Sequence, residues 1–241
     1  MHDNIRSSNA CLKSTEKIIS LAKKTNGRLH VFHLSTKEEA KLFDNQNDLK
    51  NKKITSEVCI HHLSFNDADY KTKGNFIKWN PSIKTIEDQN ALWDALISDK
   101  IDVIATDHAP HTFNEKNQLY VDCPSGGPLV QHSLYIMYEH FLEKRISLEK
   151  IVEKMCHNPA ILFNIKKRGF IREGFFADLV ILRKNQSWVI NKNNILYKCG
   201  WSPFEGKKIN SMITHTLVSG NLAYEKAVSY THLTLPTMRT V

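Results

Sequence analysis

Ile101-Asp102-Val103-Ile104-Ala105-Thr106-Asp107-His108-Ala109-Pro110-His111 is an apolar run, rich in β-branched residues, that ends in an acid and two histidines. This pattern is typical of a buried parallel strand whose carboxyl end opens into a site. In α/β folds the functional residues gather at that end of the strands. Asp107 offers a carboxylate that can bind a metal or carry a proton, while His108 and His111 offer imidazole nitrogens. A strand followed by an ordinary polar turn would have the same residues, so the neighbouring segments decide between the two.

Two earlier segments have the same character. Residues 28–33 read as a strand that ends in His33, and residues 54–60 read as a strand followed by a His-His pair. Helical patterns cover residues 11–25, Ser35 to about Asn45, and Ile86 to Ser98. This alternation predicts a parallel α/β arrangement. Three consecutive strands that end in histidine or Asp-His predict a metal-assisted site, with His33 and Asp107 facing a common cavity at one edge of the sheet.

The composition is that of an ordinary globular protein of one or two domains. Of the 241 residues, 41% are hydrophobic and 24% are charged, and no apolar run approaches the ~18 residues that a membrane span needs. The first residues have no apolar core, so no secretory signal is expected. The five cysteines are scattered without a C-x-x-C pair, which favours reduced thiols in a cytoplasmic protein over disulfides or a cysteine-based zinc site.

The net charge of +8 is spread along the chain in short basic groups such as Lys52-Lys53 and Lys166-Lys167-Arg168. No basic stripe with interleaved aromatic residues accompanies these groups. We interpret the charge as mostly a solvated surface and expect neither nucleic acid nor membrane as a partner.

The chain changes character after Gly169. Before this point, the glycine-rich loop Cys123–Pro128 leads into helices expected from Leu129 to Lys144 and from Leu148 to Cys156. After it, short β-like runs alternate with turn residues, which predicts a small β-rich unit. Residues 229–241 show no periodicity that connects them to the rest, and we interpret them as a non-native or disordered tail.

Several of these motifs resemble, in order and spacing, the C-terminal half of the dihydroorotases of the amidohydrolase superfamily. The segments that carry the resemblance are His33-Leu34-Ser35-Thr36, Glu57–Leu63, Asn80-Pro81, Ala105–His111, Pro124–Leu134, Asn158-Pro159-Ala160 and Gly174–Leu182. The similarity covers roughly residues 5–227. It implies the C-terminal part of a (β/α)8 TIM barrel, about its last three strands, over residues 1–168. A small β-rich domain segment over residues 169–228 would follow.

The resemblance also implies a reaction. Dihydroorotases reversibly cyclise N-carbamoyl-L-aspartate to L-dihydroorotate in de novo pyrimidine biosynthesis, with one or two Zn²⁺ ions at the carboxyl ends of the strands. By position, His33 would bind zinc, and Asp107 would bind zinc and carry a proton between the attacking hydroxide and the ring nitrogen. Hydrolysis of a ring amide needs a metal that lowers the pKa of water from ~15.7 toward ~7 and a base that returns the proton to the leaving nitrogen.

Other residues would bind the substrate or support the site. The resemblance implies that Asn80 and His111 hold the substrate, and that the backbone of Gly126 and Gly127 approaches its ring. It gives a supporting or structural role to three more histidines, namely His61, His62 and His108.

Several of the family's functional residues have no counterpart in this chain. The His-x-His pair and arginine of the first barrel strand, the carboxylate or modified lysine and one further histidine are absent. His33 and Asp107 are then the only usual metal ligands, whereas zinc takes ~3–4 protein ligands. A barrel without about five of its eight strands also leaves open edges. We therefore expect the chain alone to bind zinc poorly and to have no measurable dihydroorotase activity.

Two alternatives remain open at this point. Another cyclic amidohydrolase, such as a hydantoinase or allantoinase, would share the metal ligands, although Asn80-Pro81 and the Ser-Gly-Gly-Pro loop favour dihydroorotase. A non-catalytic scaffold for aspartate transcarbamoylase is the second, although the intact Asp107 and His111 favour an enzyme. The partners expected are a small-molecule substrate and either a second copy of the chain or aspartate transcarbamoylase.

Overall fold

The computed structural model describes residues 2–45 and 48–226, and the predicted tail over 229–241 lies outside them. The first half contains α1 (His2–Ile5), α2 (Ser8–Thr25), β1 (Leu29–Val31), α3 (Lys37–Ala40), β2 (Ile54–Cys59), α4 (Ile60–Ser64), η1 (Asp67–Asp69), α5 (Tyr70–Lys73), η2 (Gly74–Ile77), α6 (Ile86–Ile97), β3 (Val103–Ala105) and α7 (Phe113–Lys116). The second half contains η3 (Val130–His132), α8 (Ser133–Leu142), α9 (Leu148–Val152), η4 (Glu153–His157), α10 (Asn158–Leu162), β4 (Leu179–Val189), η5 (Lys192–Asn194), β5 (Lys208–Val218) and β6 (Asn221–Glu225).

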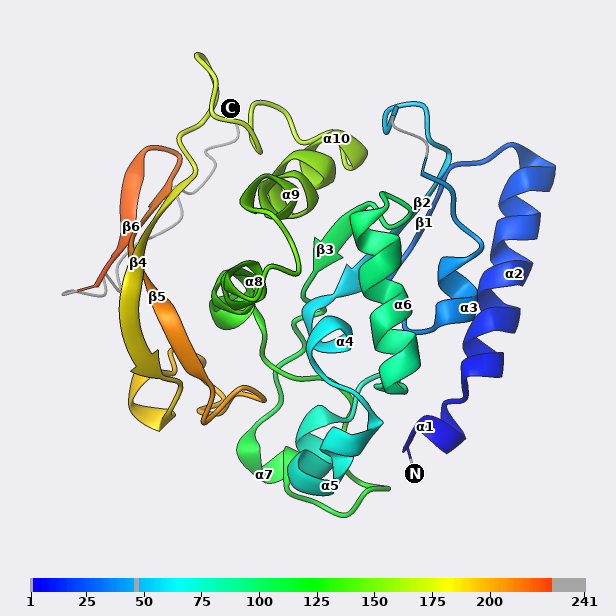
Figure 1. Ribbon diagram of the computed structural model, residues 1–241, viewed down its shortest axis with the longest axis horizontal. Coiled ribbons are helices and arrows are strands. Elements are labelled where there is room, and N and C mark those ends of the chain that lie inside the picture. The colour runs from blue at the N-terminus through cyan, green and yellow to red at the C-terminus, as the bar shows by residue number, and fades with distance from the viewer. Residues whose placement is uncertain (1, 46–47, 227–241) are drawn as a thin grey trace, which may run out of the picture.

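A three-stranded parallel sheet in the order β1-β2-β3 forms the centre of the first half. The register pairs Leu29 with Ile54 and Glu57 with Val103. The parallel pairing predicted for these segments is confirmed. Helices α2 and α3 lie near β1 at one end of this sheet, and α8 and α9 lie between β3 and the second sheet (Figure 1).

Local signals explain where the helices begin and end. The side chain of Ser7 accepts a hydrogen bond from the first turn of α2, and that of Thr85 does the same for α6. Asn26 ends α2 in the left-handed conformation. The helix expected from Ser35 to about Asn45 is wrong in length. It is reduced to the single turn of α3, because turns follow Ala40 directly.

The solvated lysine surface expected from the sequence is also wrong for some of the lysines, and five are buried: Lys52, Lys78, Lys84, Lys116 and Lys154. Lys52 is 2% exposed and its ammonium group lies 2.8 Å from a carboxylate oxygen of Asp102. The other oxygen of Asp102 accepts a hydrogen bond from the backbone N–H of Ser56 at 3.0 Å. A buried charge is tolerated when it is paired and hydrogen-bonded in this way. The pair joins the start of β2 to the residue before β3.

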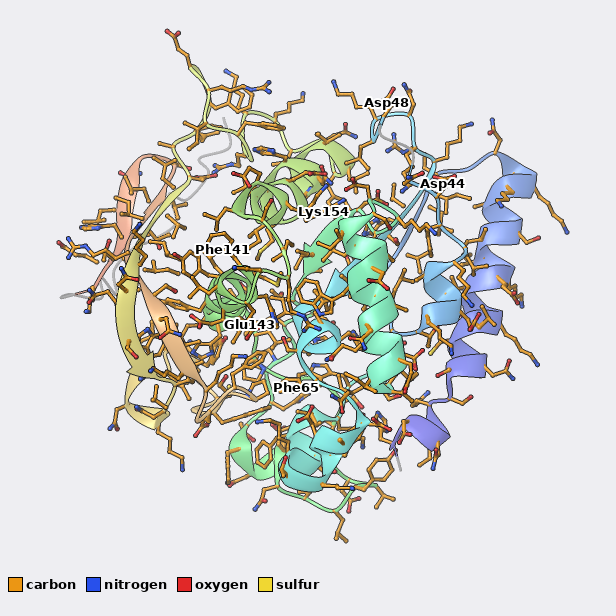
Figure 2. The ribbon with its side chains drawn as sticks, in the orientation of Figure 1. Asp44, Asp48, Phe65, Phe141, Glu143 and Lys154 are labelled. Atoms are coloured by element: carbon orange, nitrogen blue, oxygen red, sulfur yellow. The ribbon has the colours of Figure 1, made fainter. Side chains whose placement is uncertain are left out.

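The second half contains an antiparallel sheet in the order β4-β5-β6, as the β-rich pattern after Gly169 predicted. Helix α8 attaches this sheet to the rest of the fold. The Tyr135 hydroxyl accepts a hydrogen bond from the backbone of Ile213, and Glu139 accepts two from Asn210. Side chains from α8 and from both sheets fill the space between them (Figure 2). Within the described residues, no helix is both long enough and apolar enough to cross a membrane.

Candidate active site

Each strand of the parallel sheet is followed, at the second residue beyond its end, by a side chain that can bind a metal. These residues are His33 after β1, His61 after β2 and Asp107 after β3. Because the carboxyl ends of parallel strands meet at one edge of a sheet, the three residues belong to the same edge. The topology therefore places at one edge the two predicted ligands, His33 and Asp107, and His61, which was expected to have only a supporting role.

The backbone at this edge turns sharply after two of the strands. His33 has a φ of 41° and Asp107 a φ of 46°, a left-handed conformation that residues with a side chain seldom adopt. The N–H of Leu34 donates to the carbonyl of Glu57 at 2.9 Å, so the turn after β1 stays tied to β2. Strain of this kind persists where the surrounding structure enforces it, which is common at functional sites.

The charges at this edge act on one another. Burial raises the pKa of Asp107 above its ordinary value, the neighbouring His33 imidazole opposes this, and the negative charge of Glu57 adds to it. A carboxyl group with a raised pKa holds a proton more readily than an exposed one. Asp107 is thus suited to accept and return a proton.

Two buried histidines follow β2. The ring of His61 stacks on Trp79 with centroids 4.4 Å apart and planes 9° apart. Burial lowers the pKa of His61 well below its ordinary value, and the neighbouring imidazoles of His62 and His33 act in the same direction. Burial likewise lowers the pKa of His62 to about 3. Both rings are neutral near pH 7, the form in which imidazole binds metals.

Glu57 of β2 also makes a hydrogen bond with His30 of β1. One ring nitrogen of His30 lies 3.1 Å from a Glu57 carboxylate oxygen, and the other lies 2.8 Å from the Thr55 hydroxyl. Burial raises the pKa of both Cys59 and Asp107, and the negative charge of Glu57 raises each further. The Glu57 carboxylate thus places negative charge close to the candidate metal ligands.

Two of the predicted substrate-binding residues, Asn80 and His111, line separate clefts, and Gly126 and Gly127 line neither of these. His33 and Asn80 line a cleft of about 540 Å³ beside α2 and β1. His108 and His111 line another of about 570 Å³. Asp107 is not among the residues that line either cleft. The cavity shared by His33 and Asp107 therefore stays a prediction.

The glycine loop packs against the turn after β3. The N–H of Ala109 donates to the carbonyl of Gly127, and a Cβ on Gly126 would lie 2.7 Å from the Cβ of Ala109. A Cβ on Gly127 would meet Trp79 at 2.8 Å. A side chain at either position would collide with these neighbours, so the close packing explains why both residues are glycine. One nitrogen of His108 accepts the N–H of Leu129 at 3.0 Å, which agrees with a structural role for that histidine.

Two buried lysines, Lys116 and Lys78, donate hydrogen bonds to backbone carbonyls in and near the glycine loop. No sequence pattern indicated this role. The Lys116 ammonium donates to the carbonyls of Pro124 and Lys78, and that of Lys78 donates to the carbonyl of Tyr120. Burial lowers the pKa of Lys116 to about 8. From sequence alone, a lysine is expected at the protein surface. Its apolar stem can nevertheless be buried while its ammonium group donates hydrogen bonds to a loop.

Sequence reasoning also missed Cys59. Its thiol lies beside His61 and His62 at the junction of β2 and α4. The signal was present in the sequence, because Glu57 and Cys59 are alternate residues at the end of the predicted strand and His61 follows directly after that strand. The search for C-x-x-C spacing does not detect such a mixed set.

Comparison with known proteins links this architecture to one family. Residues 11–223 match the model of the amidohydrolase family. A dihydroorotase of Endomicrobium trichonymphae is 36% identical over 208 residues, which cover 86% of this chain and 49% of that protein. A dihydroorotase of Pyrococcus furiosus is 32% identical over 215 residues, 89% of this chain and 49% of that protein. The chain thus spans about half the length of the curated relatives it matches.

Solved structures show the same relationship. An L-hydantoinase (dihydropyrimidinase) from Arthrobacter aurescens superimposes with a TM-score of 0.81 at 27% identity, covering 89% of this chain and 49% of that one. A dihydropyrimidinase from Brevibacillus agri gives a TM-score of 0.82 at 20% identity, covering 93% of this chain and 50% of that one. The second likeness concerns the fold alone. Both place the described strands and helices within about half of a larger enzyme structure.

Proposed function

The chain belongs to the amidohydrolase family, and from this premise we propose that it is the C-terminal part of a zinc-dependent dihydroorotase, which interconverts N-carbamoyl-L-aspartate and L-dihydroorotate in pyrimidine biosynthesis. One observation carries the proposal. In a chain whose curated relatives are dihydroorotases, His33 and Asp107 occupy the same position after two strands of one parallel sheet.

The residues at this edge fit a zinc ion. Zinc prefers imidazole and carboxylate or thiolate ligands, and His33 and Asp107 supply the first two kinds. His61 is a candidate third ligand, because neither of its buried ring nitrogens has a hydrogen-bond partner among the described residues. When bound, zinc would polarise the amide carbonyl and lower the pKa of water. Its remaining ligands would come from the half of the barrel that the relatives have and this chain does not span.

Asp107 would carry the proton. It would take a proton from the attacking water and return it to the ring nitrogen as the amide bond breaks, and the reverse reaction would use the same path. Burial, which raises its pKa, favours the protonated form that the second step requires. The nearby Glu57 carboxylate acts in the same direction.

Asn80, His111 and the loop at Gly126-Gly127 would bind the substrate. Asn80 shares with His33 a cleft of about 540 Å³, within the size range of small-molecule sites. Both the ring and the backbone of His111 are held by hydrogen bonds. Its ring nitrogen donates to the carbonyl of Ser125, and its own carbonyl accepts the indole N–H of Trp201 at 2.7 Å. A ring held in this way keeps a fixed orientation in the cleft that it lines.

The deciding experiment is an assay of the full-length protein that carries this segment. Its rates with dihydroorotate, hydantoin and allantoin are measured before and after treatment with a chelator. We expect dihydroorotate to be the best substrate and the chelator to abolish its turnover. A preference for hydantoin would instead support the hydantoinase function suggested by the Arthrobacter aurescens structure. Lack of turnover with all three substrates would support the non-catalytic scaffold, which copurification with aspartate transcarbamoylase would then test.

A further inference from the structure

Cationic side chains gather in a cleft near the amino ends of β1 and β2, away from the edge that carries His33 and Asp107. The cleft has a volume of about 410 Å³, which lies within the range of small-molecule sites. None of the residues that line it is acidic. Half of its twelve lining residues are lysine or arginine, namely Arg28, Lys50, Lys166, Lys167, Arg168 and Arg172.

Three segments that are far apart in the sequence supply these charges. Arg28 directly precedes β1, Lys50 lies in the turn before β2, and residues 166–172 follow α10. Helix α10 lies beside the loop that leads into β2 (Figure 1). The Arg28 guanidinium donates to the carbonyl of Lys50 at 3.2 Å, which joins the first two segments. The basic groups are separate in the sequence, and only the fold brings them together.

Most of these cations have no carboxylate partner. Among the described residues, only Arg168 of this set forms an ion pair, with Asp178, and it also donates to the Ser219 hydroxyl at 2.9 Å. Glu173, the neighbour of Arg172 in the sequence, does not line the cleft. Like charges that are held close together repel one another, and an anion that binds between them relieves the repulsion. The unpaired positive charge therefore points to an anionic ligand.

The aromatic rings of the cleft already have partners. Phe170 stacks on His157 with centroids 4.3 Å apart and planes 6° apart, and the Arg172 guanidinium lies 4.4 Å from the centroid of the same ring. That guanidinium is also 6.0 Å from the centroid of Phe175. Cation–π contacts of this kind hold an arginine in place. Because a nucleic-acid base needs a free ring to stack on, the cleft is suited to the charge of a ligand rather than to a base.

We propose that this cleft binds an oligophosphate anion, either inorganic triphosphate or the triphosphate chain of a nucleotide. Guanidinium groups bind two phosphate oxygens at once, and lysine ammonium groups act toward phosphate as point charges on flexible stems. A chain of linked phosphates presents several negative charges to the cations of one cleft, which a single carboxylate does not. The site lies at the opposite ends of the strands from His33 and Asp107, so it is independent of the proposed dihydroorotase function.

Isothermal titration calorimetry of the chain of 241 residues tests the site with inorganic triphosphate, ATP and adenosine. The chain is freed of metal with a chelator, which is then dialysed away, so that no phosphate binds through an ion at the other edge. We expect one equivalent of triphosphate to bind and adenosine not to bind. Added salt should weaken the binding, because it screens exposed charges. Equal affinities for triphosphate and ATP would identify the phosphate chain itself as the ligand, whereas binding of ATP that is tighter by about tenfold or more would identify a nucleotide.

A variant of the cleft locates the bound anion. Its three exposed lysines carry no ion pair with a described residue, so their replacement removes charge without breaking a contact of the fold. The combined variant is Lys50→Gln, Lys166→Gln and Lys167→Gln. It should weaken triphosphate binding by about tenfold or more, since one hydrogen bond to a charged group is commonly worth about tenfold.

The matched control removes the same charge elsewhere. Lys13→Gln, Lys17→Gln and Lys71→Gln change exposed lysines outside the cleft and should leave the affinity unchanged. The inference is overturned if the chain binds neither triphosphate nor ATP, if the cleft variant binds as tightly as the parent chain, or if the control variant loses affinity equally. Binding of a single-stranded oligonucleotide without binding of triphosphate would also overturn it, in favour of a nucleic-acid surface. Far-ultraviolet circular dichroism of both variants verifies that they are folded.

Discussion

His33 and Asp107 stand in matching places, each the second residue beyond a strand of the parallel sheet and each in a left-handed backbone conformation. The strands that carry them lie on either side of β2. This relationship gives the proposed function its geometry, because one imidazole and one carboxylate reach the same edge from two different strands. His61 occupies the corresponding position after β2, so each of the three strands is followed by a residue that can bind a metal.

Asp107→Asn should abolish catalysis by the full-length protein without unfolding it. The amide can neither accept the proton from water nor return it to the ring nitrogen, and loss of a general acid–base group typically costs ~10²–10⁴-fold in rate. The measurement is kcat with dihydroorotate, together with the zinc content and a thermal melt. Asp122→Asn, at an exposed carboxylate, is the matched control. If Asp107→Asn retains near-normal kcat, the proton must be carried by another group.

The chain of 241 residues should have no measurable dihydroorotase activity on its own. It spans about half the length of its curated relatives, and its parallel sheet has three strands. A catalytic centre that draws ligands from both halves cannot be completed by one of them. The measurement is zinc-dependent ring opening of dihydroorotate by the purified chain. Turnover at a rate comparable with that of the full-length protein would refute the assignment of missing ligands to the other half.

Acid should destabilise the metal-free chain through its buried histidines. Burial lowers the pKa of His62 from 6.5 to about 3 and that of His132 from 6.5 to about 4. The unfolded chain binds these protons near pH 6.5 but the folded chain does not. Stability is therefore retained above pH 6.5 and is lost as the pH falls toward the folded-state values. The loss for each such histidine is about 1.4 kcal/mol per pH unit.

Urea unfolding at several pH values between 7.5 and 5 measures this dependence. His62→Gln and His132→Gln should each reduce the slope of stability against pH by about one proton. The two sites lie in different elements, so their effects should add. An unchanged slope in either variant would show that the histidine concerned is not held neutral by the fold.

Gly126→Ala should destabilise the loop that the proposed substrate approaches. Gly126 has a φ of 122°, and a Cβ there would lie 2.7 Å from the Cβ of Ala109 and 2.8 Å from its carbonyl oxygen. We expect a loss of about 1–3 kcal/mol in the free energy of unfolding, measured with urea. Gly174→Ala is the control, since φ is 76° there and nothing lies within 4 Å of the added methyl group. It should cost clearly less, and equal costs would exclude the contact with Ala109 as the cause.

The sequence predicted the parallel strands and the residues that follow them, because buried apolar runs and their terminal histidines are local signals. The helix predicted from Ser35 to about Asn45 was too long, because α3 ends at Ala40 and turns follow it. Lys52 and Lys116 were likewise expected to be part of a charged surface, whereas burial by distant segments decides the role of each. For the same reason, His61 was expected to have only a supporting or structural role. Its unpartnered nitrogens and its packing on Trp79 depend on tertiary contacts that no short motif records.

Trp79 occupies a position from which two events can be observed. Its indole lies flat on His61 and limits the space at Gly127. A change in the charge of that imidazole, or a shift of the glycine loop, alters the surroundings of the same chromophore. The protein thus carries an intrinsic optical reporter. In a variant in which Trp93, Trp188 and Trp201 are replaced, the emission of Trp79 can follow ion arrival and a shift of the glycine loop without any attached dye.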